Sequence, residues 1–286
     1  MNAREAGLRG GDGMRGEPCA AGFQIPPQPY VLHELGKLLA APSENPKAIA
    51  ALIRRDAGLT ARVLRLANSP LHSRGKRIEG VDKAVQAIGP SRIAGIVKGL
   101  PPGTASGVRE RFYQRFWERS ESIALLAALV ARAQLAACNV SPDLAHMAGM
   151  FHACGVPILM QRIPDYGLSF RLSAQGGWPD CGEENRRFNT DHAVVGFFAA
   201  RHWRLPAIIC EAIRYHHETL DAGYDAITLV SILQMARHLY HCATGIRDED
   251  WPVLKRQVLE EIGVDGGGAR EFEEEILEKF HHALPR

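Results

Sequence analysis

The chain has 286 residues, of which 46% are hydrophobic and 23% charged, and its formal net charge is +2. This apolar content is enough for one large core or two smaller cores packed together. The near-neutral charge argues against nucleic acid or an anionic membrane surface as the main partner. The most apolar stretch, residues 122–138, is too short and too polar to span a bilayer, so we expect a soluble protein.

The N-terminal residues 1–22 are expected to form a disordered tail. They are rich in glycine and carry mixed charges, so they cannot bury enough surface to offset the entropy of ordering. They also lack the apolar run of a secretion signal. The six cysteines are widely scattered without a CxxC pair, a distribution that favours free thiols in a reducing compartment. Together these features predict a cytoplasmic protein.

Residues 23–100 predict an N-terminal helical lobe. A proline-rich run, 25–29, is expected to be extended, because proline disfavours the helical conformation in the residue before it. Beyond it, apolar residues recur at spacings of three and four, as on the inner face of a helix. Pro46 suits the first turn of a helix, and Asp56 suits an N-cap. The expected helices are 31–39, 46–53, 56–67, 81–88 and 93–100.

A second helical lobe is predicted over residues 108–245. Two prolines and three glycines between residues 99 and 107 are typical of a hinge, and we place the linker at 101–107. Residues 246–286 are expected to form a helical extension. The two-residue alternation of strands persists nowhere, so the fold class predicted is all-α with two lobes. The expected helices are 110–138, 142–162, 191–201, 206–217, 226–243, 252–262 and 270–283.

One arginine-rich segment of the first lobe raises the alternative of DNA binding. A short helix, a turn and a second helix between Arg54 and Arg65 could form a helix-turn-helix. The simpler interpretation is a solvated basic face opposite an apolar one, and the low net charge favours it. We therefore do not expect nucleic acid as a partner.

The second lobe carries most of the histidines. Three predicted helices are involved: 142–162 carries His152, 191–201 carries His192, and 206–217 ends in the pair His216-His217. The first of these helices also carries His146, and the predicted helix 226–243 carries His238 and His241. A single histidine is more often an ordinary core or surface residue. Three helices that each present one could instead hold a zinc ion, since neutral imidazole is the commonest metal ligand.

Several motifs resemble those of the HDOD domain, a relative of the HD and HD-GYP phosphohydrolases. The resemblance runs from about residue 23 to about residue 245 and implies a two-lobed helical fold, with an N-terminal helical bundle and an HD-like helical lobe. The motifs that carry it, in order, are Ile25-Pro26-Pro27, the run from Asp56 to Ser69, Ala84–Gly89, Trp117–Ser120, Ala148–His152, Asp191–Gly196 and Trp203–Pro206.

The resemblance also implies what an active relative would need. HD enzymes hold one or two metals with a first histidine, a His-Asp pair and a distant aspartate, whose carboxylates neutralise and bridge the metals. Here the first histidine falls near Ser120, the pair on His152-Ala153 and the distant aspartate near Arg237. Only His152 survives, so the resemblance implies a degenerate site without metal, cofactor or catalytic residue.

One remnant favours the opposite interpretation. Residues 215–224, which begin Tyr215-His216-His217-Glu218, are similar to the HHExxDGxGYP signature of cyclic-di-GMP phosphodiesterases, with Asp225 in place of the final proline. With the other ligands missing, we interpret it as an echo of shared ancestry.

The sequence thus predicts a non-catalytic bacterial regulatory module for signal transduction, which acts through contacts with a protein partner. The vestigial pocket at His152, His192, His216 and His217 is expected to be the place for any small anionic or nucleotide ligand. Two alternatives remain open: a metal-dependent phosphodiesterase with a histidine-only site, and a DNA-binding regulator that uses residues 54–65.

Overall fold

The computed structural model describes residues 23–41, 45–70, 77–100, 108–172, 178–218 and 225–283. Within these ranges the chain forms sixteen helices and no strand, so the all-α prediction is confirmed. None of the described helices is long and apolar enough to cross a membrane. The predicted disordered tail at 1–22 and the predicted linker at 101–107 lie outside the described residues.

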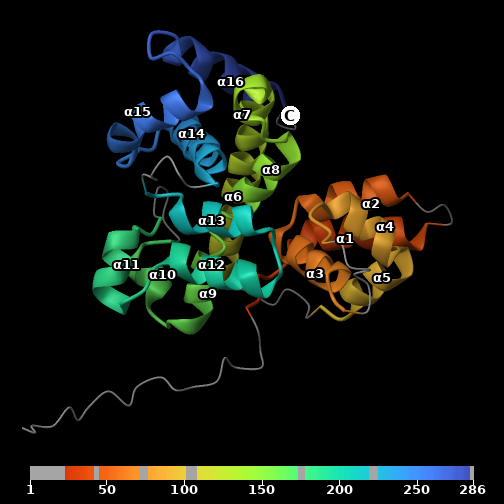
Figure 1. Ribbon diagram of the computed structural model, residues 1–286. Helices are drawn as coiled ribbons and strands as arrows, with labels where there is room; N and C mark the ends of the chain where they lie inside the picture. The colour runs from red at the N-terminus through yellow and green to blue at the C-terminus, as the bar shows by residue number, and fades with distance from the viewer. Residues whose placement is uncertain are drawn as a thin grey trace, which may run out of the picture.

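Five short helices form one group, drawn in red to yellow in Figure 1. The chain is extended up to Gln28, as its prolines predict, and α1 begins at Pro29. The side chains of Asn45 and Asp56 cap α2 and α3 by accepting hydrogen bonds from the backbone N–H groups of Ala48 and Leu59. The helices are α1 (Pro29–Ala40), α2 (Pro46–Arg54), α3 (Ala57–Ala67), α4 (Val81–Ile88) and α5 (Pro90–Lys98).

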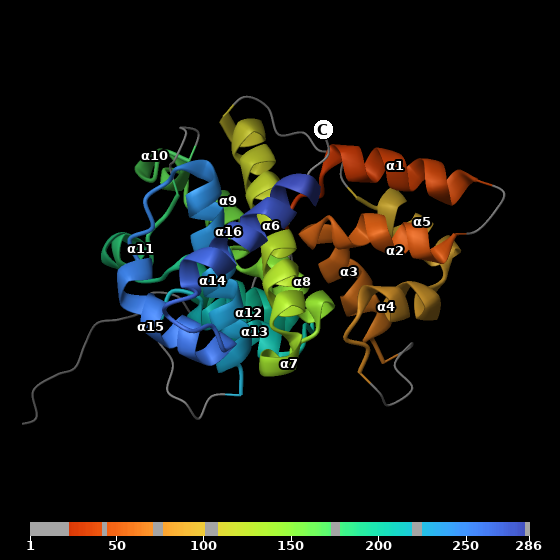
Figure 2. The ribbon, with the colours of Figure 1, turned by 90° about the horizontal axis from the view of Figure 1, so that it is seen from above.

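The second group is built around the long helix α6, with α8 and α14 packed against it (Figures 1 and 2). Its buried Phe112, Phe116 and Ile123 contribute to the core. The other helices surround this centre. The bounds are α6 (Val108–Ala133), α7 (Leu135–Cys138), α8 (Pro142–Phe151), α9 (Gly155–Arg162), α10 (Tyr166–Ser169), α11 (Cys181–Phe188), α12 (His192–His202), α13 (Ala207–Tyr215), α14 (Ile227–Thr244), α15 (Trp251–Ile262) and α16 (Ala269–Ala283).

The structure differs from the expected elements in three places, the first at Gln134, where the helix expected over 110–138 is divided into α6 and α7. The helix expected over 142–162 is broken into α8 and α9 by a turn at 152–154. Pro157 explains the break, because it has no N–H to donate to the carbonyl of Ala153 and its ring would collide with that carbonyl in a continuous helix. The helices α10 and α11 were not predicted. The break matters for function, since it places His152 in the turn.

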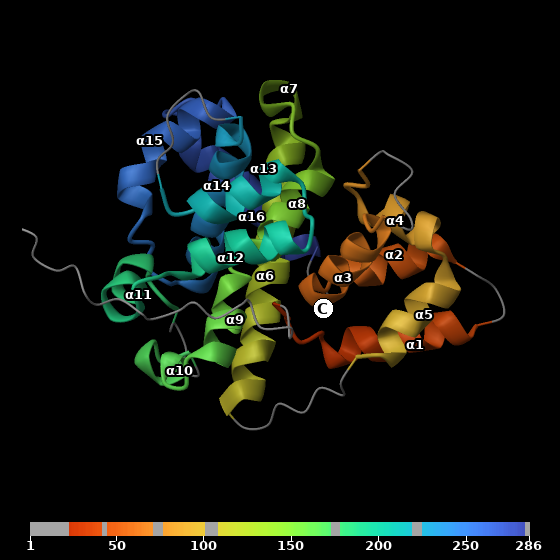
Figure 3. The ribbon, with the colours of Figure 1, turned by 60° about the horizontal axis from the view of Figure 1, so that its bottom comes forward.

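Polar contacts join the two groups of helices. The indole N–H of Trp117 donates to the carbonyl of Pro26 at 3.2 Å, and that of Trp203 donates to the carbonyl of Phe23 at 2.9 Å. The guanidinium of Arg55 pairs with Glu121 at 2.6 Å. In Figure 3 the segment that precedes α1 runs between the two groups. The chain before α1 therefore serves as a strip of contact between the lobes.

Candidate functional site

Four histidines from three parts of the second lobe meet in its interior. His152 follows α8, His192 begins α12, and His216 and His217 follow α13. The ring centroids lie 5.5 Å apart for His152 and His216, 5.4 Å for His192 and His216, 5.2 Å for His192 and His217, and 4.2 Å for His216 and His217. The structure thus brings together all four residues that the sequence singled out.

Each ring is oriented by an oxygen that accepts from its Nδ1–H. The acceptors for His152 and His216 are the carbonyls of Gly149 and Ile213, both at 2.7 Å. Those for His192 and His217 are carboxylate oxygens of Glu184 and Asp250, both at 2.6 Å. With Nδ1–H committed in this way, Nε2 is the free nitrogen of each ring.

The Nε2 atoms have few partners. Those of His152 and His216 are buried and make no hydrogen bond with any described residue. Those of His192 and His217 lie 3.3 Å from each other. This contact is a hydrogen bond only if one of the two nitrogens carries a proton, because two lone pairs would repel each other.

The electrostatics of the cluster decide which ring holds that proton. Burial opposes protonation of His192, but Cys181 and Glu184 beside it outweigh burial and raise its pKa to about 10. Burial lowers the pKa of His217 well below its ordinary value, and the charge of Arg237 lowers it further. His192 is therefore the protonated ring, and it donates through Nε2 to His217.

The two carboxylates of this cluster were not predicted from the sequence. Glu184 on α11 is fully buried and also accepts hydrogen bonds from the hydroxyl of Tyr166 and the backbone N–H of His192. Asp250 precedes α15 and lies in the segment assigned to the C-terminal extension. A signal for α11 was present, since Asp180 caps the N–H of Glu183 in a D-x-x-E pattern. No local signal pairs Asp250 with His217.

Arg237 fills the place where the resemblance implies a distant aspartate. Its side chain is buried and donates to the carbonyl of His216 at 2.6 Å and to Asp250 at 3.0 Å. A second buried cation, Arg119, is sandwiched between the rings of Trp178 and Tyr240 at 4.6 and 4.7 Å. Burial lowers the pKa of Arg119 to about 10. Two buried positive charges, those of Arg237 and Arg119, thus lie close to the histidines.

These residues do not fit the carboxylate-bridged metals of HD enzymes. Ala153 offers only a buried methyl group, and Arg237 brings a positive charge where an anion is needed. The hydroxyl of Ser120 is buried and makes no hydrogen bond with the described residues. A different donor set does exist: Cys181, His192 and His217 each place one ligand atom within 4.8 Å of the others. That set contains no carboxylate.

The remaining candidates lie away from the four histidines. His238 and His241 both contact Asp248 at 3.3 Å, and His238 stacks on Trp251. His146 lines a separate cavity of about 340 Å³. Glu218 of the phosphodiesterase-like signature pairs with Arg214, and residues 219–224 lie outside the described residues.

The arginine-rich segment does not form one continuous basic face. Arg54 pairs with Asp82, and Arg55 pairs with Glu121 at 2.6 Å. Arg62 and Arg65 instead line a cavity between the lobes. Half of the cations proposed to meet a DNA groove are therefore neutralised by acids of the chain itself.

Comparison with known proteins identifies a family. A family model of the HDOD domain matches residues 25–219. A relative from Treponema pallidum (strain Nichols), described as an uncharacterized protein, is 22% identical over 213 residues, which are 74% of this chain and 41% of that protein. The chain thus spans about two fifths of the length of that relative.

Solved structures share the fold. The MmoQ response regulator of Methylococcus capsulatus str. Bath superposes with a TM-score of 0.65 at 21% identity, over 89% of this chain and 98% of that one. A virulence factor of Campylobacter jejuni subsp. jejuni superposes with a TM-score of 0.62 at 17% identity, over 91% and 94%. At such identities the likeness shows the two-lobed helical architecture alone.

Proposed function

This chain belongs to the HDOD domain family, and from that premise we propose that it is a non-catalytic regulatory module of signal transduction that acts through protein contacts. The role of one structural neighbour, a response regulator, supports signalling as the setting. A cytoplasmic location remains part of this proposal.

The contact between Arg237 and Asp250 carries the proposal. A hydrolase of the HD type needs carboxylates on its metals, because anions neutralise the cations and position the attacking water. Here the buried guanidinium of Arg237 occupies the neighbourhood of His216 and His217 and takes Asp250 as its own counter-ion. Asp250 is thereby committed to an arginine and a histidine.

The test is a hydrolysis assay on the full chain, purified without chelator. Bis(p-nitrophenyl) phosphate and cyclic dinucleotides are offered with added Mn²⁺ or Fe²⁺, beside the His152→Ala variant. We expect no rate above that of the variant. Hydrolysis that His152→Ala abolishes would overturn the proposal.

A histidine-only metal site is the second candidate. The observation that favours it is the orientation of the four rings, since an oxygen acceptor on Nδ1 and an Nε2 without an oxygen partner are the usual arrangement of metal-binding histidines. Metal analysis of the purified chain separates the candidates. Stoichiometric zinc, iron or manganese that is lost in His192→Ala would favour the metal site, whereas a metal-free chain favours the proton between His192 and His217.

DNA binding is not favoured, because Arg54 and Arg55 are engaged by Asp82 and Glu121. A mobility shift at low salt that weakens as salt is added would restore that alternative.

A further inference from the structure

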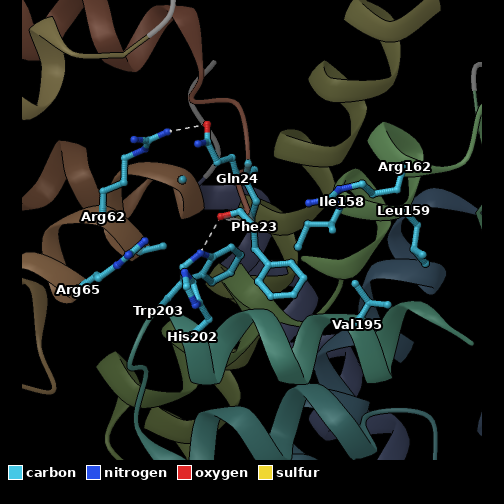
Figure 4. Close-up of a pocket in the computed structure, with 13 residues that line it drawn as sticks. Phe23, Gln24, Arg62, Arg65, Ile158, Leu159, Arg162, Val195, His202 and Trp203 are labelled. Carbon is cyan, nitrogen blue, oxygen red and sulfur yellow. Dashed lines mark hydrogen bonds between the residues drawn. The ribbon is translucent and has the colours of Figure 1, made fainter. Parts of the chain in front are cut away.

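A cavity of about 490 Å³ lies between the two lobes, far larger than a water site and within the range of small-molecule pockets. Figure 4 shows its walls. One wall is α3 of the first lobe, and the opposite walls are α9 and α12 of the second. The lining residues are Phe23, Gln24, Ile25, Gly58, Ala61, Arg62, Arg65, Ile158, Leu159, Arg162, Val195, His202 and Trp203.

The polar part of the cavity is positively charged. Arg62 and Arg65 come from α3 and Arg162 from the end of α9, and no acidic side chain is among the lining residues that the structure describes. Arg62 donates to the neutral amide of Gln24 at 3.2 Å. Burial lowers the pKa of Arg62, and Asp56 opposes this shift while Arg65 adds to it. An anion in the cavity would relieve the repulsion between these cations.

The pKa of His202 is affected by the same positive charge. Burial lowers the pKa of His202, and the charge of Arg65 lowers it further. The buried acid Asp56, whose charge acts on Arg62, is committed to the backbone N–H groups of Gln28 and Leu59, where it caps α3. The positive charge of the cavity is therefore not neutralised by a direct ion pair with Asp56.

Much of the rest of the cavity wall is apolar. Figure 4 shows the Phe23 ring between His202 and Val195, with Ile158 and Leu159 on the far side and the two α3 arginines opposite. The Phe23 and His202 rings meet edge to face at 5.8 Å. Such a wall accepts a planar group, because aromatic faces and aliphatic side chains stack on rings without requiring hydrogen bonds.

The segment that carries Phe23 is held in place from both lobes. The Trp203 indole donates to the carbonyl of Phe23 at 2.9 Å, and Gln161 donates to the carbonyl of Gln24 at 3.0 Å. On the other side, a Cβ on Gly58 would come within 2.6 Å of the carbonyl of Ile25, so only glycine allows this close approach. The cavity wall is thus preorganised by three separate contacts.

We propose that this cavity binds a small organic phosphate with a flat, largely apolar body, of which a nucleoside monophosphate is the type. The guanidinium groups of Arg62 and Arg65, both on α3, meet the phosphate, for which their planar donors suit bidentate contacts, and Arg162 adds positive charge from the opposite wall. The body lies against Phe23. The histidine cluster is a poorer place for such a ligand, since His152, His192 and His216 are at most 1% exposed.

Ligand binding here would tie the lobes together, because Arg65 and Arg162 belong to different lobes. That regulatory meaning rests on the proposed function, whereas the binding site itself does not. If the chain hydrolyses phosphodiesters and also binds nucleotides at these arginines, the proposed non-catalytic function is wrong and the proposed binding site is supported. If the chain neither hydrolyses phosphodiesters nor binds nucleotides, only the proposed binding site is wrong.

The experiment is isothermal titration calorimetry on the full chain with adenosine and guanosine 5′-monophosphates, adenosine and inorganic phosphate. We expect a mononucleotide to bind at least tenfold more tightly than either adenosine or phosphate alone. Arg65→Ala, which changes an exposed side chain, is expected to weaken this binding at least tenfold, and Arg65→Lys to restore part of it. The matched control is Arg256→Ala, an exposed arginine on α15 whose loss should leave the affinity unchanged.

Three outcomes would overturn the proposal: no saturable binding of either mononucleotide, equal affinity for inorganic phosphate, or binding that survives both Arg65→Ala and Arg162→Ala. Thermal unfolding of each variant checks that it is folded.

Discussion

Nε2 of His192 lies 3.3 Å from Nε2 of His217, and each ring donates its Nδ1–H to a different carboxylate, Glu184 and Asp250. A single proton between the two nitrogens completes a chain from carboxylate to carboxylate. The pair carries one positive charge, which Glu184 balances. A proton at this position makes the contact that a metal ion would make between two such rings, and the two occupants exclude each other.

The Glu184→Gln substitution tests this arrangement. Removing the anion lowers the pKa of His192 and leaves Cys181 as the remaining neighbour that favours its charged form, and we expect a loss of about 3 kcal/mol in the free energy of unfolding. In the wild type, ¹⁵N shifts of the His192 ring at pH 7.5 should show both nitrogens protonated. Glu183→Gln on the same helix, a half-exposed acid paired with arginines, is the control and should change little.

The pH dependence of the wild type follows from the same shift. The folded pKa of His192 is about 10 and exceeds its ordinary value of 6.5. Its contribution to stability is therefore fully present below pH 6.5 and is lost as the pH rises to 10. A neutral His192 ring at pH 7.5 would contradict the bridging proton.

The buried carboxyl of Asp56 predicts a second pH effect. Burial raises its pKa from 3.8 to about 6, despite hydrogen bonds from the backbone N–H groups of Gln28 and Leu59. A raised folded pKa gives stability that is present below pH 3.8 and lost as the pH rises through 6. We expect the wild type to lose about 3 kcal/mol relative to Asp56→Asn between pH 3.5 and 7.

Chemical denaturation across that pH range measures the difference. Asparagine at this position keeps a side-chain oxygen for the α3 cap, so the variant is expected to fold. Asp143→Asn, which removes an exposed carboxyl from the first turn of α8, controls for the loss of one acid. If the free energy of unfolding changed equally with pH in the wild type and in Asp56→Asn, the carboxyl of Asp56 would have the same pKa in the folded and unfolded states, which would contradict this prediction.

Much of the fold could be predicted from local sequence, because apolar spacing, prolines and caps act within one or two helical turns. The cap at Asp56 and the extended run before Pro29 are examples. The break at His152 also has a local cause in Pro157, although the apolar spacing on both sides of it predicts one continuous helix.

The site was only half predictable. The four histidines stood out by residue type, whereas Glu184 and Asp250 are two acids among 32 in the chain. Asp250 lies 33 residues from His217 and reaches it only because the chain after α14 turns back over the cluster. Spacing along the sequence does not encode that return, so the carboxylates required the structure.

Arg237 is expected to be essential for stability, because it is a buried cation with two partners. Replacing it with methionine leaves the carbonyl of His216 without its donor and Asp250 without its counter-ion, at a cost of about 4 kcal/mol. Urea denaturation measures the loss. Arg256→Met removes an exposed ion pair with Glu260 and should cost less than about 0.5 kcal/mol.

A double-mutant cycle with Asp250→Asn isolates the pair. A coupling energy near zero between positions 237 and 250 would show that Arg237 does not depend on this carboxylate.

A close backbone contact between α9 and α12 holds the turn that carries His152 in place. Gly155 begins α9, and a Cβ there would lie 2.0 Å from the carbonyl oxygen of His192 and 2.9 Å from the backbone N of Gly196. Both neighbours are backbone atoms that cannot rotate away. Gly155→Ala must therefore push α9 from α12 and displace His192 from His217, and we expect it to cost about 3 kcal/mol.

Gly36→Ala is the matched control. Gly36 lies on the exposed face of α1, and an added Cβ meets nothing within 4 Å. Alanine there should stabilise the chain by roughly 0.5–1 kcal/mol, because it reduces the entropy lost when the helix forms. Thermal or urea unfolding of the two variants should thus shift in opposite directions. Equal stability of Gly155→Ala and wild type would mean that α9 and α12 are not in backbone contact, and that the placement of His192 does not depend on it.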